Sequence, residues 1–558
     1  MANTAANTGG MTDPAAGPRY WRLSGIGLVV AAVFFSASLT PSLIPRSGIA
    51  QGVLSGVAMA LGYLVTAFGL WLWRLMLLPV TYDRRVRLVL YGVAVLIAIL
   101  ALIQLPAWQN ATRAVMDLPP VETGHRAIVA CLAAAVFALL WLIGSLFMMV
   151  ARRAGRALSL ILPGRLGIVA GVLIAAIAFA AFTNGVLVRR GMTLADAAFA
   201  AGEQIIDPRF QKPTDAMMTG SEQSLIAWDD LGNRGRDFVG RTPTPEEISA
   251  FTGKPAKRSA RVYVGRVSAE TARERAELAL QELIRVGGFE REILIVTTPV
   301  GTGWMDPGAH DTIDFMFGGD TAQVAVQYSY LTSVLSILTN VEYGLDQARE
   351  LFDVIHDYWS TLPPGSRPKL YIHGLSQGAL NSQATLPLFD VLADPPQGAF
   401  WAGSPFLSPI WTYVRNRRNP GSPAWRPRFG NGSMVRTTNQ QNVLDEADAP
   451  WGPIRFVFLN YGSDPIVFFD FAMLWRPPAW LAAPRAPDVA PQMRWFPLVT
   501  AFQVALDMLV ALSVERHGHF YVYQDYINGW AALTDPPDWS DERSEALKAV
   551  FAKRPLPW

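Results

Sequence analysis

Long apolar runs fill the first third of the chain, whereas short strand-like and helix-like segments alternate through the rest. Five runs approach the ~20 apolar residues that a helix needs to cross a bilayer, although serine, threonine and proline interrupt the first of them. We therefore expect a transmembrane helical domain of about five spans over residues 21–190. The runs are Leu23–Ile44, Val53–Trp73, Leu88–Leu105, Ala127–Val150 and Leu166–Val188.

The second part of the chain has the pattern of a parallel sheet. Short apolar segments rich in β-branched and aromatic residues alternate with helical segments, which is typical of strands buried on both faces. This pattern predicts helices on both faces of the sheet and functional residues at the carboxyl ends of the strands. We expect strands at Arg261–Gly265, Ile293–Thr298, Val324–Tyr330, Lys369–His373, Ala399–Ala402 and Arg455–Asn460, and helices at Ala269–Val286 and Leu345–Trp359.

Changes in composition predict the boundaries of these parts. Residues 1–20 are small and polar and predict a disordered leader, and residues 191–260 predict a connector of short helices. The α/β domain is expected over residues 261–558, with insertions at about 406–452 and 468–500. The apolar segment Leu498–Val514 predicts a helix packed on the sheet, with a lid facing the bilayer as the alternative.

The charges differ between the two parts. Residues 1–190 contain 15 arginines, no lysine and four acidic residues, whereas the remainder contains 32 basic and 41 acidic residues. With the amino terminus in the cytoplasm, nine arginines lie in inner segments and five in outer ones, so the positive-inside rule favours an extracytoplasmic α/β domain. No basic patch with interleaved aromatic residues is present, which argues against a nucleic-acid partner.

A possible nucleophile follows the strand Lys369–His373. The sequence Gly374-x-Ser376-x-Gly378 has the pattern of a nucleophile elbow, in which a strand turns sharply into a helix. The flanking glycines are needed because the strained backbone of the serine leaves no room for a Cβ on either side. The pattern therefore predicts that the Ser376 hydroxyl stands at the carboxyl end of a strand.

An acid and a base follow in the order Ser, Asp, His that α/β-hydrolases have. Asp464 comes directly after the strand that ends at Asn460, and Asp470 and Asp507 are the alternatives. Of the six histidines, only His517 and His519 follow both Ser376 and Asp464. We prefer His519 as the base, with His517 as the alternative, because aromatic residues that can pack the loop follow it.

A metal site is the competing interpretation of the two histidines. No third ligand has suitable spacing, and the single cysteine, Cys131, lies in an apolar run. We therefore expect neither a metal nor another cofactor.

Backbone N–H groups that stabilise an oxyanion are expected at two places. One belongs to Gln377, the residue after the nucleophile, and the other to a glycine-rich loop after an earlier strand, at Thr302 or Gly303. A phosphate-binding loop is a poor match there, because no Lys-Ser or Lys-Thr pair follows. The sequence Gly318-Gly-Asp320 predicts an ordinary turn.

With these motifs in place, the chain resembles a bacterial family of membrane-tethered α/β-hydrolases. The resemblance covers roughly residues 20–535 and implies a multi-pass α-helical membrane domain followed by an α/β-hydrolase fold. Relatives often have glutamate before the nucleophile where this chain has Leu375, which leaves the nucleophile intact but changes the polarity of the pocket. The segments that carry the resemblance are Thr297–Asp306, Gly318–Ala322, Gln327–Leu331, Tyr358–Pro363 and Gly462–Pro465.

These features predict a membrane-anchored serine hydrolase, with Ser376 as nucleophile, His519 as base and Asp464 orienting the imidazole. The expected partners are an acyl-ester or lipid substrate and the lipid bilayer of a bacterial-type cell membrane. One alternative is an acyltransferase of cell-envelope lipids or glycans that uses the same triad. The other is a membrane transport or scaffold protein with a catalytically silent α/β domain.

Overall fold

The computed structural model describes residues 23–76, 84–122, 124–161, 164–182, 207, 209–330, 341–386 and 392–554. The chain divides into two compact units. The first contains Met1–Leu39, Ser47–Pro106 and Val121–Arg190, and the second contains Thr40–Arg46, Ala107–Pro120 and Gly191–Trp558. Two short segments from the first third of the sequence therefore fold with the α/β unit.

The first unit is helical, as the apolar runs predict. Among the described residues, three helices are long and apolar enough to cross a membrane, namely Gly48–Trp73, Arg84–Ala114 and His125–Leu158. Glycines allow close packing between helices: a Cβ on Gly171 would lie 2.4 Å from the backbone nitrogen of Gly155. The described helices of the amino-terminal region are α1 (Gly25–Ser38), α2 (Gly48–Leu75), α3 (Arg84–Ala114), α4 (His125–Leu158) and α5 (Gly164–Phe182).

The first apolar run, Leu23–Ile44, is helical only in part. Helix α1 has 14 residues and ends at Ser38, and Thr40–Arg46 belongs to the other unit. At ~1.5 Å per residue α1 is about 21 Å long, which is shorter than the ~30 Å hydrocarbon core of a bilayer. The fifth run is helical to Phe182, and the rest of this run lies outside the described residues. The predicted leader also lies outside them, as does the part of the predicted connector before residue 209, apart from residue 207.

A sheet of seven parallel strands forms the centre of the second unit. The strand order is β1-β3-β2-β4-β5-β7-β6, with β4 in the middle. The sequence predicts six of these strands and misses β6, which is a short edge strand with the polar sequence Val-Arg-Thr-Thr. The strands are β1 (Ala260–Val264), β2 (Ile293–Thr298), β3 (Thr321–Val326), β4 (Lys369–Leu375), β5 (Gly398–Ala402), β6 (Val435–Thr438) and β7 (Arg455–Leu459).

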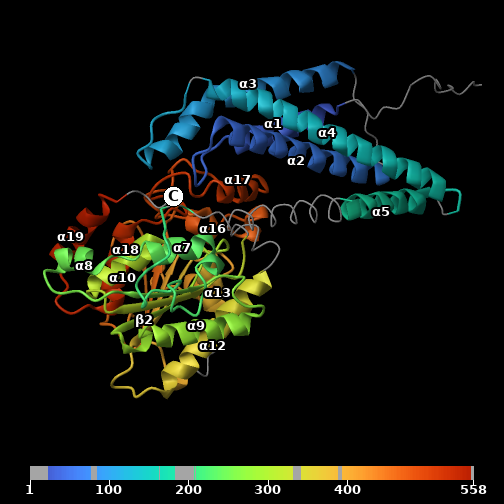
Figure 1. Cartoon of the computed structure of the whole chain (residues 1–558). Helices are drawn as coiled ribbons and strands as arrows, with labels where there is room; N and C mark the ends of the chain where they lie inside the picture. The colour runs from blue at the N-terminus through green and yellow to red at the C-terminus, as the bar shows by residue number, and fades with distance from the viewer. Residues whose placement is uncertain are drawn as a thin grey trace, which may run out of the picture. The chain divides into compact units, whose positions relative to one another are not determined.

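Helices cover both faces of this sheet, as predicted. Figure 1 shows α9 and α12 on one side of β2, and α10 and α18 on the other. The remaining helices pack around this core or follow the strands. The bounds are α7 (Gly232–Gly240), α8 (Pro245–Thr252), α9 (Ala272–Arg285), α10 (Pro307–Met316), α12 (Val341–Thr361), α13 (Gln377–Ala384), α15 (Pro409–Asn416), α16 (Pro465–Phe468), α17 (Val499–Leu509), α18 (Tyr523–Thr534) and α19 (Asp541–Phe551), with short 3-10 turns η3 (Asp229–Leu231), η4 (Gly288–Glu290), η5 (Phe471–Leu474) and η6 (Ala479–Leu481).

The strands are apolar throughout because each face of the sheet has its own core. Ile293 and Ile295 of β2 pack in a cluster with residues of α10 and α18. Leu294 and Val296, which point to the opposite face, pack in a cluster with residues of α9 and α12. Burial on both faces explains why the sequence shows continuous apolar runs instead of alternating polar and apolar positions.

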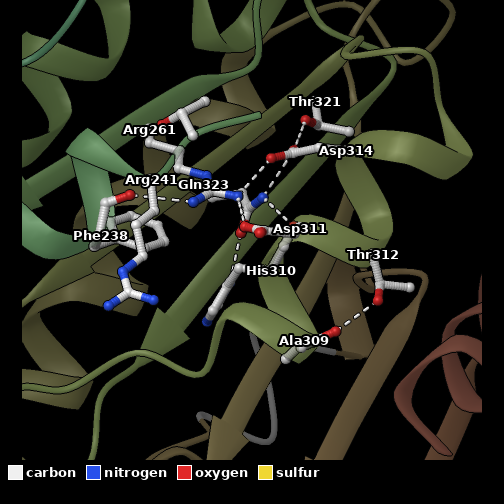
Figure 2. Close-up of polar contacts among 12 residues, drawn as sticks. Phe238, Arg241, Arg261, Ala309, His310, Asp311, Thr312, Asp314, Thr321 and Gln323 are labelled. Atoms are coloured by element: carbon white, nitrogen blue, oxygen red, sulfur yellow. Dashed lines mark hydrogen bonds and ion pairs between the residues drawn. The ribbon is translucent and has the colours of Figure 1, made fainter. Parts of the chain in front are cut away.

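A buried polar network ties α10 to β1 and β3 (Figure 2). The guanidinium of Arg261 in β1 lies 2.6 Å from a carboxylate oxygen of Asp311 and 2.7 Å from one of Asp314. Gln323 of β3 donates to Asp314 at 2.9 Å, and Thr321 also donates to that carboxylate. Because α10 follows the glycine-rich loop after β2, this network holds the helix that anchors one end of that loop.

A second buried ion pair holds the loop between α1 and α2 against α17. The Arg46 guanidinium lies 2.7 Å from a carboxylate oxygen of Asp507, and both side chains are almost fully buried. Ser42 and the N–H of Leu43 also donate to this carboxylate. The partners of Asp507, the alternative acid, therefore come from the loop between α1 and α2. The helix predicted over Leu498–Val514 is present as α17.

We expect Arg261→Leu to lower the thermal unfolding midpoint of the detergent-solubilised full chain by about 10 °C, because it leaves two buried carboxylates without their cation. Lys254→Ala is the matched control. Its partner Asp538 lies 3.3 Å away, both side chains are exposed, and the loss of such a pair costs about 1 kcal/mol or less. Equal midpoints for the two variants would contradict a structural role for the network.

Candidate active site

The backbone at Ser376 has the strained geometry of a nucleophile elbow. Ser376 lies between β4 and α13 with φ 56° and ψ −125°, a region that residues with a Cβ rarely adopt. Its N–H donates to the carbonyl of Ala402 at the end of β5, at 3.0 Å. The serine is therefore placed at the carboxyl edge of the sheet, next to the end of the neighbouring strand.

Both glycines of the motif are required by close backbone contacts. A Cβ on Gly374 would lie 2.5 Å from the carbonyl carbon of Gly378, and one on Gly378 would lie 2.0 Å from the carbonyl oxygen of Thr298. Backbone atoms cannot rotate away as a side chain can. The glycine spacing is therefore a consequence of how tightly β4, α13 and the end of β2 pack.

Asp464 is a fully buried carboxylate with donors on both oxygens. Oδ1 accepts from the N–H groups of Ile466 and Val467, at 2.9 and 3.3 Å, at the start of α16. Oδ2 lies 2.6 Å from Nδ1 of His519 and accepts from the hydroxyl of Tyr521 at 2.6 Å. These four partners compensate for the burial of the acid and fix its direction.

Tyr521 acts as a donor in this arrangement. Burial, together with the adjacent Asp464 carboxylate, raises the pKa of Tyr521 well above its ordinary value. The phenol therefore stays protonated and can only donate to Oδ2. The sequence indicated Tyr521 as a residue that packs the loop, but nothing in the pattern marked its hydroxyl as a partner of the acid.

The structure brings Asp464 together with His519 and not with His517. Nδ1 of His517 lies 3.0 Å from the carbonyl oxygen of Glu515, and its side chain is partly exposed. Two hydrogen bonds hold the loop that carries His519. The N–H of His519 donates to the Ala511 carbonyl at 2.8 Å, and the N–H of Gly518 donates to the Ser463 hydroxyl at 2.9 Å. Asp464 thus contacts an imidazole whose loop is fixed by these two hydrogen bonds.

The imidazole of His519 packs on Gly403, which lies next in the chain to a residue bonded to Ser376. Gly403 follows Ala402, the residue whose carbonyl binds the Ser376 N–H, and it has φ +55°. A Cβ on Gly403 would lie 2.5 Å from Cε1 of His519, so the ring packs directly on the glycine. Nε2 of His519 is buried and has no hydrogen-bond partner among the described residues, which leaves it available to take a proton. Gly403 is not among the residues predicted from the sequence, although a glycine directly after a predicted strand is a usable signal.

The two loop candidates for the oxyanion site differ in the structure. The N–H of Gly303 donates to the Val300 carbonyl at 2.8 Å, so a local turn already uses it. The N–H of Thr302 makes no hydrogen bond within the described part of the chain. Gln377, the other predicted donor, directly follows Ser376 and is the first residue of α13.

The remaining acidic and histidine candidates have other contacts. Asp470 accepts from the N–H of Ala472 at the start of η5, at 2.8 Å. His373 is buried within β4, where its Nδ1 lies 2.8 Å from the Phe400 carbonyl oxygen, and burial lowers its pKa to about 4. It is therefore neutral near pH 7 and acts as a core residue. No group of three potential metal ligands occurs within the described ranges.

Comparison with known proteins assigns the family. A profile described as the alpha/beta-hydrolase family matches residues 260–547, more than half of the chain. The chain belongs to the α/β-hydrolase family. A second profile, described as the N-terminus of this family, matches residues 39–243. Neither the curated proteins nor the solved structures contain a match. The fold class and the family that the sequence predicts are thus confirmed for this α/β-hydrolase.

We expect Gly403→Ala to slow covalent labelling of the protein by a fluorophosphonate probe by about 100-fold, because the new methyl group displaces the His519 ring by about 1 Å. Gly421→Ala is a matched control: Gly421 also has a positive φ, +82°, but a Cβ there meets nothing within 4 Å. The labelling rate and the thermal midpoint of each variant are measured together. Equal labelling rates for the two folded variants would show that Gly403 does not position the His519 ring.

Proposed function

We propose that this α/β-hydrolase is a membrane-anchored serine hydrolase that acts on acyl esters, with lipids as the substrate class. The observation that carries the proposal is the buried Asp464–His519 pair at 2.6 Å, whose ring packs on Gly403 beside the Ser376 elbow. The acid Asp464 follows the end of β7, the base His519 lies in the loop after α17, and the nucleophile Ser376 follows the end of β4. Such convergence at one edge of a parallel sheet supports a catalytic role over a silent domain.

The arrangement supports acyl transfer through a covalent intermediate. Nε2 of His519 takes the proton of the Ser376 hydroxyl while the serine oxygen attacks the ester carbonyl, and Asp464 stabilises the imidazolium through Nδ1–H. The imidazolium then protonates the leaving alcohol. Water attacks the acyl-serine in the second half of the reaction, with His519 again as base, and the free acid leaves.

Two backbone amides support the charge that develops on the carbonyl oxygen. The N–H of Gln377 at the start of α13 is one donor, and we assign the N–H of Thr302 as the other because the N–H of Gly303 is already bonded to Val300. The Arg261 network, which fixes α10, stabilises the loop that carries Thr302.

The division of the chain into units supports a location on the outer face of a membrane. The segments Thr40–Arg46 and Ala107–Pro120, which follow α1 and the apolar part of α3, fold with the catalytic unit. In a chain that crosses a bilayer alternately from α2 onward, the segments before α2, after α3 and after α5 lie on the same side. Arginines are more numerous beside the α2–α3 and α4–α5 loops, seven against five, which favours an extracytoplasmic location for that side.

We expect a fluorophosphonate probe to label the full-length protein and to leave Ser376→Ala unlabelled, because the probe reacts with an activated serine hydroxyl. Ser366→Ala, which removes an exposed hydroxyl, is the control and should label like the wild type. Equal labelling of wild type and Ser376→Ala would refute the proposed nucleophile. A deletion phenotype that Ser376→Ala fully rescues would instead support a transport or scaffold role.

His519→Ala and His517→Ala should differ in ester hydrolysis. Loss of the base should lower kcat by about 10³-fold or more. Loss of His517, whose Nδ1 lies 3.0 Å from the Glu515 carbonyl oxygen, should change kcat less than about twofold. Rates on a soluble short-chain ester measure both effects. A larger loss for His517→Ala would assign the base to His517. Product analysis with added alcohols separates hydrolysis from transfer to an acceptor.

A further inference from the structure

Helix α17 has its polar residues inside and its apolar residues outside. Thr500, Gln503 and Asp507 are completely buried, whereas Phe502 and Leu509 are exposed. A surface helix of a water-soluble domain shows the opposite pattern. The exposed face of α17 carries no charged side chain, because Asp507 is the only charged residue from Val499 to Ser513.

The buried polar face holds the loop between α1 and α2. Asp507 binds Arg46, and Gln503 donates to the Thr40 carbonyl at 3.2 Å, while Arg46 also donates to the Gln503 carbonyl at 3.2 Å. In the sequence, only Ser47 separates Arg46 from Gly48, where α2 begins. Chain connectivity therefore keeps the backbone of Arg46 within about 7 Å of the start of a candidate membrane span, and the Arg46 side chain binds α17.

The apolar face of α17 continues onto neighbouring segments. The Leu498 N–H, just before the helix, donates to the Leu474 carbonyl of η5 at 3.0 Å. Phe471 of η5 is 60% exposed, and Trp475, which directly follows η5, is 67% exposed. Leu509 and Leu512 are 66% and 47% exposed. Large exposed apolar residues grouped in this way mark an interaction surface.

We propose that the face formed by Phe471, Trp475, Phe502, Leu509 and Leu512 docks the catalytic unit onto the lipid bilayer. Three observations select lipid as the occupant: the inverted polarity of α17, the absence of charge on its outer face, and the direct chain connection from its buried face to α2. An exposed tryptophan at the rim suits the membrane interface. The unit would thus be a membrane-surface domain in its own right and not one carried free on a tether.

Docking by this face brings the active site close to lipid. The chain leaves α17 and reaches His519 within ten residues, and the Ala511 carbonyl beside the exposed Leu512 accepts the His519 N–H at 2.8 Å. An ester group near the bilayer surface then needs to move only a short distance to reach Ser376. This consequence rests on the proposed hydrolase function, whereas the docking itself does not.

Site-directed fluorescence tests the docking. Leu509→Cys is made in a Cys131→Ser background, labelled with bimane, and placed as a single copy per nanodisc. Nitroxide-labelled lipids should quench this probe, and aqueous iodide should quench it several-fold less than a probe at Ile284→Cys. Ile284 is a matched control because it is a 44% exposed apolar residue of α9, on a face of the sheet unit.

Two results would overturn the proposal. Iodide quenching of position 509 that equals that of position 284 would show a face in water. Shielding from both iodide and nitroxide lipids would show that protein covers the face, either another part of the chain or, if it appears only with two copies per disc, a second molecule.

An activity measurement separates docking from the chemistry. Leu509→Asp should lower hydrolysis of a vesicle-embedded ester by about tenfold and leave hydrolysis of a soluble short-chain ester unchanged, because a charge disfavours the apolar contact. Equal effects on both substrates would contradict docking. If the wild type hydrolyses neither substrate, the proposed hydrolase function fails, and the quenching result still decides the docking proposal.

Discussion

The turn between β4 and α13 leaves room for glycine alone on both sides of Ser376, and the rest of the site is arranged around this constraint. Gly378 packs on the carbonyl of Thr298, the last residue of β2. The same contact therefore brings the start of the glycine-rich loop after β2 next to the Ser376 turn. One close backbone approach thus places both the hydroxyl and the candidate oxyanion donors.

The Asp464–His519 pair depends on a different principle, the compensation of a buried charge. Asp464 has no exposed surface, and four donors surround its two oxygens. Removing any one of them leaves part of a carboxylate unsatisfied in an apolar environment. This requirement fixes the imidazole of His519 in one orientation, and Gly403 provides the space in which the ring lies.

A similar compensation joins the amino-terminal segments to the catalytic unit. Asp507 lies on the buried side of α17, and its cation, Arg46, comes from the loop between α1 and α2. The apolar residues of α17 then face outward. The loop between α1 and α2 therefore supplies the charge that allows α17 to bury its polar side. A catalytic unit cut from the chain at about residue 190 would lose this partner.

The sequence by itself determines the helical first part, six of the seven strands, the elbow and the order Ser, Asp, His, because these features depend on local periodicity and spacing. It also points to Tyr521 as a packing residue. Only the tertiary structure decides that His519 contacts Asp464, that Gly303 is used in a turn, that β6 joins the sheet edge and that Asp507 pairs with Arg46. Each of these contacts joins groups that are distant in the sequence and meet only when the chain folds. A buried charge needs a partner, but its own sequence neighbourhood does not specify which one. No local pattern contains that information.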